Sequence, residues 1–412
     1  MKPTDLRVAL FSGNYNYVRD GANQALNLLV GYLLDQGVKV RVYSPTTDTP
    51  AFPPTGDLVS VPALPVPGGR DEYKFAKGIK AVLPDLEAFA PNLVHVSAPE
   101  ILGHRAVTWA RRNNIASVAS VHTRFETYPA YYHIGFVTPL LIWTLTRFYN
   151  RFDTVMPTGR GMEELLRSWG VERPMQIWSR GVNHDRFNPG RRSLEWRRAL
   201  GIADDEVAVS FLGRLVLEKG LDIFAEVVGE LQRRGVKHRV LVIGKGPAQQ
   251  WFADRVPDAV FAGFQAGDDL GRAVASMDVF FNPSLTESFG NVTLEAMAAG
   301  VAVVAANAVG PVGMVEENVS GLLVDPGKGA VGRYADAIQH YCENHAARKA
   351  AGAAGHAIAE TYQWDAINQK VLDAYLEAIA RRGGENAGTR KRCASPPQAS
   401  LPRISQPVLA TG

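Results

Sequence analysis

Two carboxylates on either side of a short turn are the residues of this sequence best suited to chemistry. Glu287 and Glu295 lie eight positions apart in FNPSLTESFGNVTLEAMAAGVAVVAA, residues 281–306. The pattern predicts a strand, a polar loop with Glu287, a helix with Glu295, a glycine stop and a second strand. Ligands of open α/β sheets bind at the carboxyl ends of the strands, so we expect both carboxylates at such an edge.

The start of that helix suits an anion. Its free backbone N–H groups and the positive end of its dipole stabilise a diphosphate, and a carboxylate on each side can accept hydrogen bonds from sugar hydroxyls. This layout is the one that a sugar-nucleotide site needs. In the sequence, this helix start falls within the stretch Phe289, Gly290, Asn291 and Val292.

A pair of cations follows an earlier strand. In FLGRLVLEKG the strand ends at Gly213, Arg214 comes next, and Lys219 precedes a helix. At the edge of a sheet, Arg214 would bind a diphosphate through bidentate hydrogen bonds and Lys219 would bind it as a point charge. Taken alone, the two residues are better explained as solvated surface cations.

Two glycines follow the next strand. The stretch LVIGKGP contains Gly244 and Gly246. Glycine lets a loop pass close to a nucleotide, although many strand-to-helix turns also use it. The sequence lacks both the Gly-x-Gly-x-x-Gly fingerprint and the Gly-x4-Gly-Lys-Ser/Thr phosphate loop, so NAD and ATP fit poorly.

The first half of the chain offers a turn and a histidine. In VRDGANQAL, Gly21 lies between a strand and a helix, where the acceptor or a donor phosphate would meet a helix start. In SVHTRFETY, His122 closes a strand and can hydrogen-bond a sugar hydroxyl or relay a proton; a purely structural histidine is the alternative. Arg124 beside it can pair with a sugar carboxylate or face phospholipid.

Metal-binding patterns are absent from the sequence, which contains no Asp-x-Asp, His-x3-His or Cys-x-x-Cys. We therefore expect no metal site and no cofactor. The charge of a leaving diphosphate would instead be neutralised by Arg214, Lys219 and the helix start before Val292.

These residues need strands and helices to position them, and the chain alternates the two. A Pro- and Gly-rich stretch, residues 45–70, is expected to be a loop, and PMQIWSRGVN, residues 174–183, a strand and a turn. The alternation predicts an α/β fold of two doubly wound, Rossmann-like domains facing each other across a cleft. The expected divisions are an acceptor-binding domain (1–185), a nucleotide-sugar domain (186–365), a helix that packs back on the first domain (366–382) and a disordered tail (383–412).

Composition narrows the class of protein. The 412 residues are 46% hydrophobic and 21% charged with a net charge of +3, which favours a globular protein and gives no reason to expect nucleic acid as a partner. The two cysteines and the absence of a leader pattern favour the cytoplasm. No stretch reaches the ~20 apolar residues of a membrane span. Residues 135–152 are expected to form a buried helix; an element at a membrane interface is the alternative.

Taken together, these segments resemble one large family, the retaining nucleotide-sugar glycosyltransferases of the GT-B fold that carry a Glu-x7-Glu motif (glycosyltransferase family 4 type). FLGRLVLEKG, LVIGKGP and ESFGNVTLEAMAAG carry the likeness, which covers roughly residues 1–380. HTRFETY and DGANQAL look most like bacterial enzymes that transfer mannosyl, glucosyl, glucuronosyl or sulfoquinovosyl groups to membrane lipids.

The resemblance implies a role for each matching residue. Arg214 and Lys219 should bind the donor diphosphate, Glu287 the hexose and Glu295 the ribose. The amides from Phe289 to Val292 should hold phosphate or sugar oxygens, and His122 should hydrogen-bond the sugar near its reactive carbon. The family transfers with retention by front-face attack, in which the leaving phosphate takes the proton of the acceptor, so no side-chain nucleophile is required. One departure concerns the first turn, where Asp20-Gly21-Ala22 replaces the Gly-Gly pair of many relatives.

The function expected from this resemblance is transfer of a hexose (mannose, glucose or glucuronate) from a GDP- or UDP-sugar to a membrane lipid. Diacylglycerol, ceramide and phosphatidylinositol are the candidate acceptors, and the protein would lie on the inner face of the cell membrane. Three alternatives stay open: the same chemistry on a soluble or polysaccharide acceptor, a sugar-nucleotide epimerase or phosphorolytic enzyme, and a protein that binds its ligands without turnover.

Overall fold

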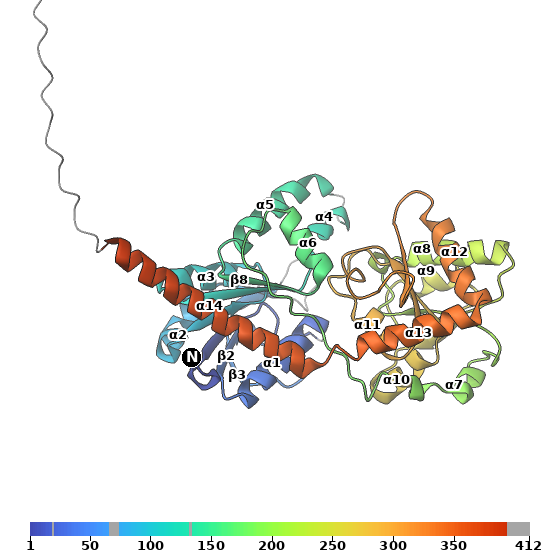
Figure 1. Cartoon of the computed structure of the whole chain (residues 1–412), viewed down its shortest axis with the longest axis horizontal. Coiled ribbons are helices and arrows are strands. Elements are labelled where there is room, and N and C mark those ends of the chain that lie inside the picture. The colour runs from blue at the N-terminus through green and yellow to red at the C-terminus, as the bar shows by residue number, and fades with distance from the viewer. Residues whose placement is uncertain (19, 66–73, 132–133, 394–412) are drawn as a thin grey trace, which may run out of the picture.

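The chain folds into two lobes, each built around a parallel sheet with helices packed against it (Figure 1). The structure is a computed structural model, and it describes residues 1–18, 20–65, 74–131 and 134–393. The expected fold class, two doubly wound α/β units, is confirmed.

The first sheet has the strand order β3-β2-β1-β6-β7-β8, with every pair parallel. Its order reverses between β1 and β6, and a ligand crevice of an open sheet lies at such a switch point. The strands are β1 Arg7–Phe11, β2 Lys39–Ser44, β3 Asp57–Ser60, β6 Leu93–Val96, β7 Ala116–Val121 and β8 Thr154–Pro157; β4 Ala63–Pro65 and β5 Lys74–Ala76 form a separate antiparallel pair.

The second sheet repeats this plan with the order β11-β10-β9-β12-β13-β14, again parallel throughout. Its reversal lies between β9 and β12, the strands that precede the Arg214/Lys219 loop and the Glu287 loop. The strands are β9 Ala208–Leu212, β10 Arg239–Ile243, β11 Val260–Gly263, β12 Val279–Asn282, β13 Ala302–Ala306 and β14 Gly321–Val324.

Helices cover both sheets. The α-helices are α1 Gly21–Asp35, α2 Leu83–Phe89, α3 Ile101–Arg112, α4 Tyr128–Tyr131, α5 Thr138–Tyr149, α6 Arg160–Ser168, α7 Leu194–Ala199, α8 Leu221–Arg233, α9 Gln249–Ala253, α10 Gly267–Ala275, α11 Asn291–Ala298, α12 Ala330–Glu343, α13 His345–Ala359 and α14 Trp364–Cys393. Single 3-10 turns are η1 Pro3–Asp5, η2 Lys80–Val82, η3 Phe125–Thr127, η4 Gly135–Val137, η5 Pro189–Arg191 and η6 Leu217–Lys219.

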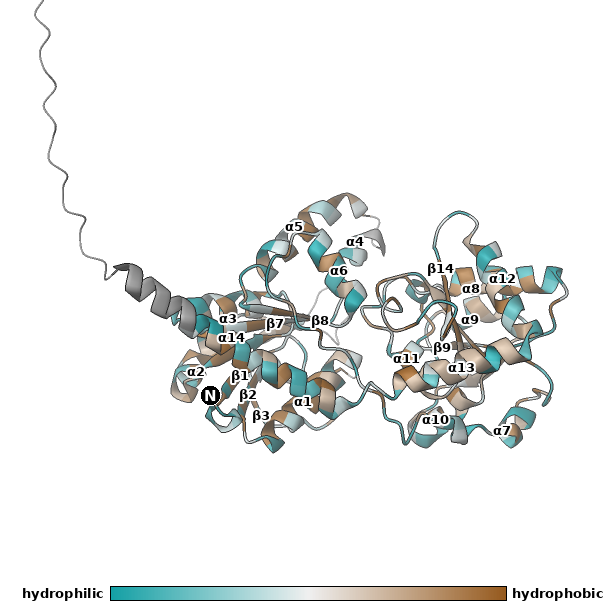
Figure 2. Cartoon of the chain, viewed as in Figure 1, coloured by the Kyte–Doolittle hydropathy of each residue, from teal (hydrophilic) through white to brown (hydrophobic). Residues whose placement is uncertain are grey.

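Apolar strands and one-sided helices produce the cores. Helix α8 shows the pattern: its buried residues Leu221, Phe224, Val227, Val228 and Leu231 recur at helical spacing and pack on the second sheet. The hydrophobic colouring of the strands inside each lobe shows the same arrangement (Figure 2). Because both faces of each sheet are covered, the strands read as almost continuous apolar runs.

The last helix returns to the first lobe. Helix α14 packs on α1 and β7 and crosses that lobe in Figure 1. Its residues Val371, Leu372 and Tyr375 belong to the same buried cluster as strand β1. Where the chain passes between the lobes, Gly181 lies flat on the Trp364 ring, because a Cβ at Gly181 would come within 2.6 Å of it.

Several local expectations differ from the structure. Within residues 45–70, the described part contains strands β3 and β4 rather than a continuous loop, and residues 66–70 lie outside the described residues. Residues 174–183 form a single bridge, Val155 to Met175, instead of a strand. Strand β14 was not expected at all. Residues 383–393 continue helix α14, so a disordered start at residue 383 is wrong; residues 394–412 are outside the described part.

The segment 135–152 also differs from the buried helix that we favoured. It consists of η4 and α5, and only the inner face of α5, with Leu145, Phe148 and Tyr149, is buried. Phe136, Leu140 and Trp143 point outward. The sequence alone does not separate these cases, because both faces of the helix carry apolar side chains.

Candidate functional site

The loop between β12 and α11 is bound to the carboxyl ends of two strands in the other lobe. Ser288 Oγ donates to the His122 carbonyl at 2.6 Å, and Thr158 Oγ1 donates to the Ser288 carbonyl at 2.6 Å. Arg124 Nη1 donates to the Leu285 carbonyl at 2.7 Å. The carboxyl edges of the two sheets therefore face each other, as ligand binding between the lobes requires.

Asn282, the last residue of β12, organises this loop. Its Nδ2 donates to Glu287 Oε2 and to Thr293 Oγ1, both at 3.1 Å, while its Oδ1 accepts from the Ser284 N–H at 3.2 Å. Gly290, with φ +93°, turns the chain into α11 in a backbone conformation that favours glycine. The local sequence thus positions Glu287 beside the amino terminus of the helix.

Lys219 and Glu287, predicted separately, form an ion pair. Lys219 Nζ lies 2.9 Å from Glu287 Oε1, and the side chains are 34% and 8% exposed, respectively. Lys219 ends η6, and Gly220 follows with φ +75° and packs against Pro283. The two carboxyl ends, β9 and β12, are thereby joined by opposite charges.

Arg214 is exposed, and its side chain forms no hydrogen bond or ion pair with any residue that the structure describes. The neighbouring glycines are required by close backbone contacts. A Cβ at Gly244 would lie 1.9 Å from the Gly213 carbonyl oxygen, and one at Gly246 would lie 2.3 Å from that of Leu215. Gly213 and Gly244 also have φ values of +146° and +138°. The glycines therefore hold the two loops together, and their contact with a nucleotide stays a prediction.

Glu295 lies one turn inside α11, on the same helix start. Burial raises its pKa to about 8; the cation of Arg186 opposes this shift and the nearby Glu287 carboxylate adds to it. The pKa effect of Glu287 places the two carboxylates within electrostatic reach of each other. Phe289 packs its ring into the core near Tyr362, and Val292 packs at the edge of the same core, so these residues can offer only backbone groups.

Two helix starts face each other between the lobes. A Cβ at Gly21, the first residue of α1, would come within 2.4 Å of Asn291 Nδ2 at the start of α11. Asp20 caps α1, since its Oδ1 accepts from the Asn23 N–H at 2.8 Å. The structure thus brings together Gly21, Lys219, Glu287, Gly290, Asn291 and, on the same helix, Glu295.

His122 is held in a directional chain of hydrogen bonds. Arg180 Nη2 can only donate, so at 2.6 Å it makes His122 Nδ1 an acceptor and leaves the ring proton on Nε2. Nε2–H then donates to Ser120 Oγ (2.8 Å), Ser120 donates to His95 Nε2 (2.8 Å), and His95 Nδ1–H donates to Tyr375 Oη (2.7 Å). Burial and the Arg180 cation lower the pKa of His122 well below its usual value, so the ring is neutral.

Both ring nitrogens of His122 are therefore occupied in this structure. A hydrogen bond from the ring to a donor sugar requires that one of these bonds open, and it stays a prediction. The carbonyl of His122 already accepts from Ser288 of the other lobe.

Sequence reasoning missed Arg180 and weighed Arg124 instead. Arg124 is occupied, because its Nε lies 2.6 Å from Glu126 Oε1 in a largely buried ion pair. Arg180 is 4% exposed and has no carboxylate within 4.0 Å among the described residues. The signal for Arg180 in the sequence is a cation two positions after Trp178, the last residue of the mostly apolar stretch MQIW.

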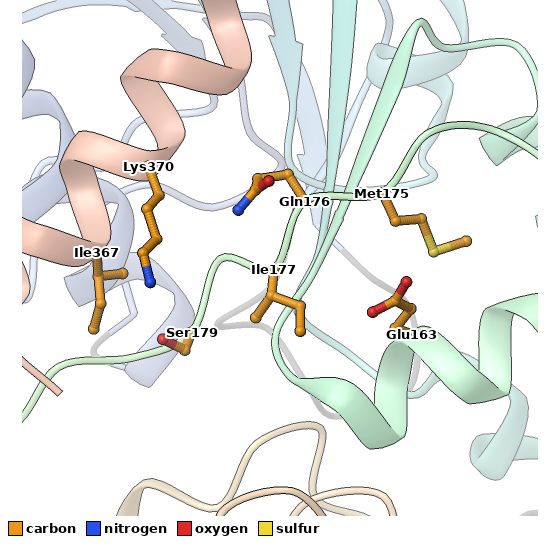
Figure 3. Close-up of a pocket in the computed structure, with 7 residues that line it drawn as sticks. All are labelled: Glu163, Met175, Gln176, Ile177, Ser179, Ile367 and Lys370. Carbon is orange, nitrogen blue, oxygen red and sulfur yellow. The ribbon is translucent and has the colours of Figure 1, made fainter. Parts of the chain in front are cut away.

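One cavity in the described residues lies elsewhere. It measures about 380 Å³ and lies between α6, α14 and residues 175–179; Ile367 and Lys370 come from α14 and Glu163 from α6 (Figure 3). A second, of about 290 Å³, lies beside α3 and Arg151. None of the predicted site residues lines either cavity.

Two features are absent from the described residues. No group of three or more His, Cys, Asp or Glu side chains is placed to hold a metal ion. No described helix has the length and apolar character that a membrane crossing needs.

Comparison with known proteins identifies the family. A model described as Glycosyltransferase Family 4 matches residues 19–186, and one described as Glycosyl transferases group 1 matches residues 206–344. A GDP-mannose-dependent alpha-mannosyltransferase of Mycobacterium tuberculosis is 31% identical over 299 residues, 72% of this chain and 76% of that relative. The chain belongs to glycosyltransferase family 4 and is a glycosyltransferase.

Other family 4 relatives give the same picture. A GDP-mannose-dependent alpha-mannosyltransferase of Corynebacterium glutamicum is 31% identical over 270 residues; the match spans 65% of this chain and 63% of that relative, slightly under two thirds of its length. Sulfoquinovosyl transferase SQD2 of Arabidopsis thaliana is 28% identical over 384 residues, 90% of this chain and 74% of that relative.

Solved structures show the same fold. Sucrose-phosphate synthase of Thermosynechococcus elongatus superposes with a TM-score of 0.74 at 20% identity, covering 91% of this chain and 100% of that one. The glycosyltransferase WaaG superposes with a TM-score of 0.65 at 18% identity, covering 89% and 99%. These likenesses establish the GT-B architecture of this family 4 glycosyltransferase.

Proposed function

We propose that this glycosyltransferase moves a hexose from a nucleoside diphosphate sugar to a hydroxyl of a membrane lipid, with retention of configuration at the transferred carbon. The observation that carries the donor half is the cluster of Lys219, Glu287 and the amino terminus of α11 at the carboxyl edge of the second sheet. The observation that supports the lipid half is the exposed apolar row on η4 and α5.

The donor half rests on a division of labour between charges. The helix start and Lys219 are positive, so they stabilise the diphosphate as it leaves. Glu287 and Glu295 lie on either side of that helix start and accept hydrogen bonds from the hexose and ribose hydroxyls. Arg214 extends from the same edge without a partner in the described residues and is free to add a bidentate contact.

Retention follows if the acceptor attacks from the face that the diphosphate leaves. The bond between the acceptor oxygen and the sugar carbon forms, the bond from that carbon to the phosphate oxygen breaks, and the hydroxyl proton passes to the departing phosphate. Glu287 is engaged by Lys219 and Asn282, and His122 by Arg180 and Ser120. Neither is arranged as a free nucleophile, which fits a step that needs none.

The acceptor half rests on three side chains at helical spacing. Phe136, Leu140 and Trp143 are 82%, 63% and 56% exposed, and they share the outer side of η4 and α5. The guanidinium of Arg147 lies 5.2 Å from the Trp143 ring centre, one turn further along the helix. An apolar row with an aromatic and a cation at its end fits the boundary between lipid tails and headgroups.

The names of the relatives suggest the donors to test first. Two of them are GDP-mannose-dependent, and a third transfers sulfoquinovose. We therefore propose GDP-mannose as the first donor and UDP-hexoses as the next.

The test uses radiolabelled GDP- and UDP-sugars with vesicles that contain diacylglycerol, ceramide or phosphatidylinositol. We expect labelled sugar in the organic phase with the wild-type protein, and roughly a 100-fold loss in Glu287→Gln if one charge-assisted contact in the transition state is lost. Transfer only to water-soluble acceptors would contradict the lipid half. Release of a free epimerised sugar without any transfer would contradict the reaction class.

A second measurement isolates the lipid surface. The double variant Leu140→Ser, Trp143→Ser should lose vesicle flotation and keep its melting temperature, because both side chains are exposed. Leu64→Ser is the matched control, since Leu64 is 54% exposed on a different element, β4. Equal flotation of all three proteins would rule out this surface.

A further inference from the structure

Arg180 is a buried cation without a counterion. Its residue is 4% exposed, and none of the described carboxylates lies within 4.0 Å of it. Arg197 in the second lobe is the natural comparison, because it is fully buried and lies 2.9 Å from Asp278 Oδ2. Taking a guanidinium out of water is costly unless an opposite charge compensates it. Arg197 follows that rule and Arg180 does not.

The hydrogen bonds of Arg180 do not make up the difference. Its Nη1 reaches the carbonyls of Trp178 and Ser179 only at 3.4 and 3.3 Å, and its one short bond, at 2.6 Å, goes to the neutral ring of His122. Arg197 instead donates to the carbonyls of Ser276 and Glu206 at 2.8 and 2.6 Å in addition to its carboxylate.

The carboxylate whose charge acts on Arg180 is already engaged at a helix start. This carboxylate is Asp20, and both of its oxygens are bound to Asn23, where they cap α1. The positive end of the α1 dipole lies at that cap. On the other side, Arg180 contacts His122, at the carboxyl edge of β7 that faces the loop between β12 and α11.

We propose that Arg180 binds an anionic group of a substrate, a carboxylate, sulfonate or phosphate that enters between the lobes next to His122. The inference rests on the proposed function and deepens it, because it makes one of the two substrates an anion. The group belongs either to the transferred hexose or to the lipid acceptor. A guanidinium fork recognises all three groups with charge-assisted hydrogen bonds. Arg124, the cation suggested by the sequence, is already paired with Glu126.

The first test needs no substrate. Arg180→Gln removes the charge and keeps an amide that can donate to His122, and Arg197→Gln is the matched control. We expect Arg180→Gln to melt at the wild-type temperature or above it, because no counterion is abandoned. Arg197→Gln should melt roughly 6 °C lower or more, because it removes the buried partner of Asp278 and leaves that carboxylate paired with the partly exposed Arg192. Comparable losses in both variants would mean that Arg180 is structural, and would overturn the proposal.

The second test compares anionic with neutral ligands by thermal shift. The donor arm uses UDP-glucuronate against UDP-glucose and GDP-mannuronate against GDP-mannose. The acceptor arm uses vesicles with phosphatidylinositol against vesicles with diacylglycerol. In one arm, the affinity of the anionic ligand for the wild type should be ~10- to 100-fold higher than its affinity for Arg180→Gln. The affinity of the neutral ligand should be the same for both proteins. The arm that responds identifies the substrate that carries the charge.

Three results would overturn the inference. In the first, the wild type shows no preference for the anionic ligand in either arm. In the second, Arg180→Gln weakens the binding of neutral and anionic ligands equally. In the third, Arg180→Gln loses affinity for UDP or GDP alone, which would assign Arg180 to the diphosphate. Failure of the proposed function looks different, because the wild type would then neither transfer nor hydrolyse any donor.

Discussion

The ion pair between Lys219 and Glu287 allows a quantitative prediction. One Glu287 oxygen accepts from Lys219 at 2.9 Å and the other from Asn282 at 3.1 Å, in a side chain that is 8% exposed. Lys219→Met leaves the first oxygen charged and unpaired in a buried position. Because Lys219 itself is 34% exposed, water can replace part of the lost contact, so we expect a cost of ~2 kcal/mol rather than the larger penalty of a fully buried pair.

The assay is thermal unfolding of wild type, Lys219→Met, Glu287→Gln and the double variant, with Lys237→Met as an exposed control. A cost of ~2 kcal/mol corresponds to a melting temperature lower by about 4–8 °C in a domain of this size. The double variant should lose less than the sum of the single variants, since removing the carboxylate relieves its unpaired charge. UDP or GDP should also stabilise Lys219→Met less, with an affinity ~10- to 100-fold weaker.

One pattern would refute this reasoning. Suppose that Lys219→Met had the melting temperature of the wild type and that UDP or GDP stabilised both proteins equally. The ion pair would then contribute nothing to stability, and Lys219 would not bind the diphosphate. A loss of stability with unchanged nucleotide binding would confine Lys219 to a structural role.

Three further predictions concern single residues. The pKa of Glu295 is about 8 in the folded protein against 4.5 in an unfolded chain, so its contribution to stability is present below pH 4.5 and lost as the pH rises through 8. Glu295→Gln should therefore flatten the decline of the melting temperature between pH 4.5 and pH 8. An unchanged decline in this variant would contradict the assignment. Imidazole ¹⁵N spectra should show His122 as the neutral Nε2–H form throughout pH 5.5–8, whereas a titration in that range would exclude the hydrogen-bond direction set by Arg180. Gly244→Ala should be more destabilising than Gly201→Ala by ~2 kcal/mol or more. Both glycines have positive φ, but only a Cβ at Gly244 would meet a carbonyl oxygen, at 1.9 Å. Equal melting temperatures of the two variants would argue against that contact.

Local patterns predicted the parts of the molecule that depend on neighbouring residues. The strand–loop–helix unit around Glu287 and Glu295 formed as expected, because apolar β12, the turn at Gly290 and the helical α11 lie within one short stretch. The two sheets followed from the same alternation. Strand β14 was missed because its edge position depends on pairing with β13, and nothing in its own four residues requires that partner.

The site residues that depend on distant contacts could not be read from the sequence. The pairing of Lys219 with Glu287 joins residues 68 positions apart, and Arg180 meets His122 across 58 positions. The sequence also gave no reason to prefer Arg180 over Arg124, because it does not reveal that Glu126 turns back to neutralise its near neighbour Arg124. Residue types and their spacing identified the candidate groups. The charge state of each group, and which of its hydrogen-bond donors and acceptors stay available to a ligand, depend on the fold.

The opposed helix starts explain why a departure from the family pattern at the first turn is tolerated. Gly21 touches Asn291, so the first residue of α1 must lack a Cβ for the two helix starts to approach, and one glycine is sufficient for that. The preceding position holds Asp20, whose carboxylate caps α1 and acts electrostatically on Arg180. An aspartate there reduces the positive potential of the helix start without pairing with the arginine. Asp20 can thus keep a buried cation tolerable in the free protein while leaving its guanidinium available to a stronger anion.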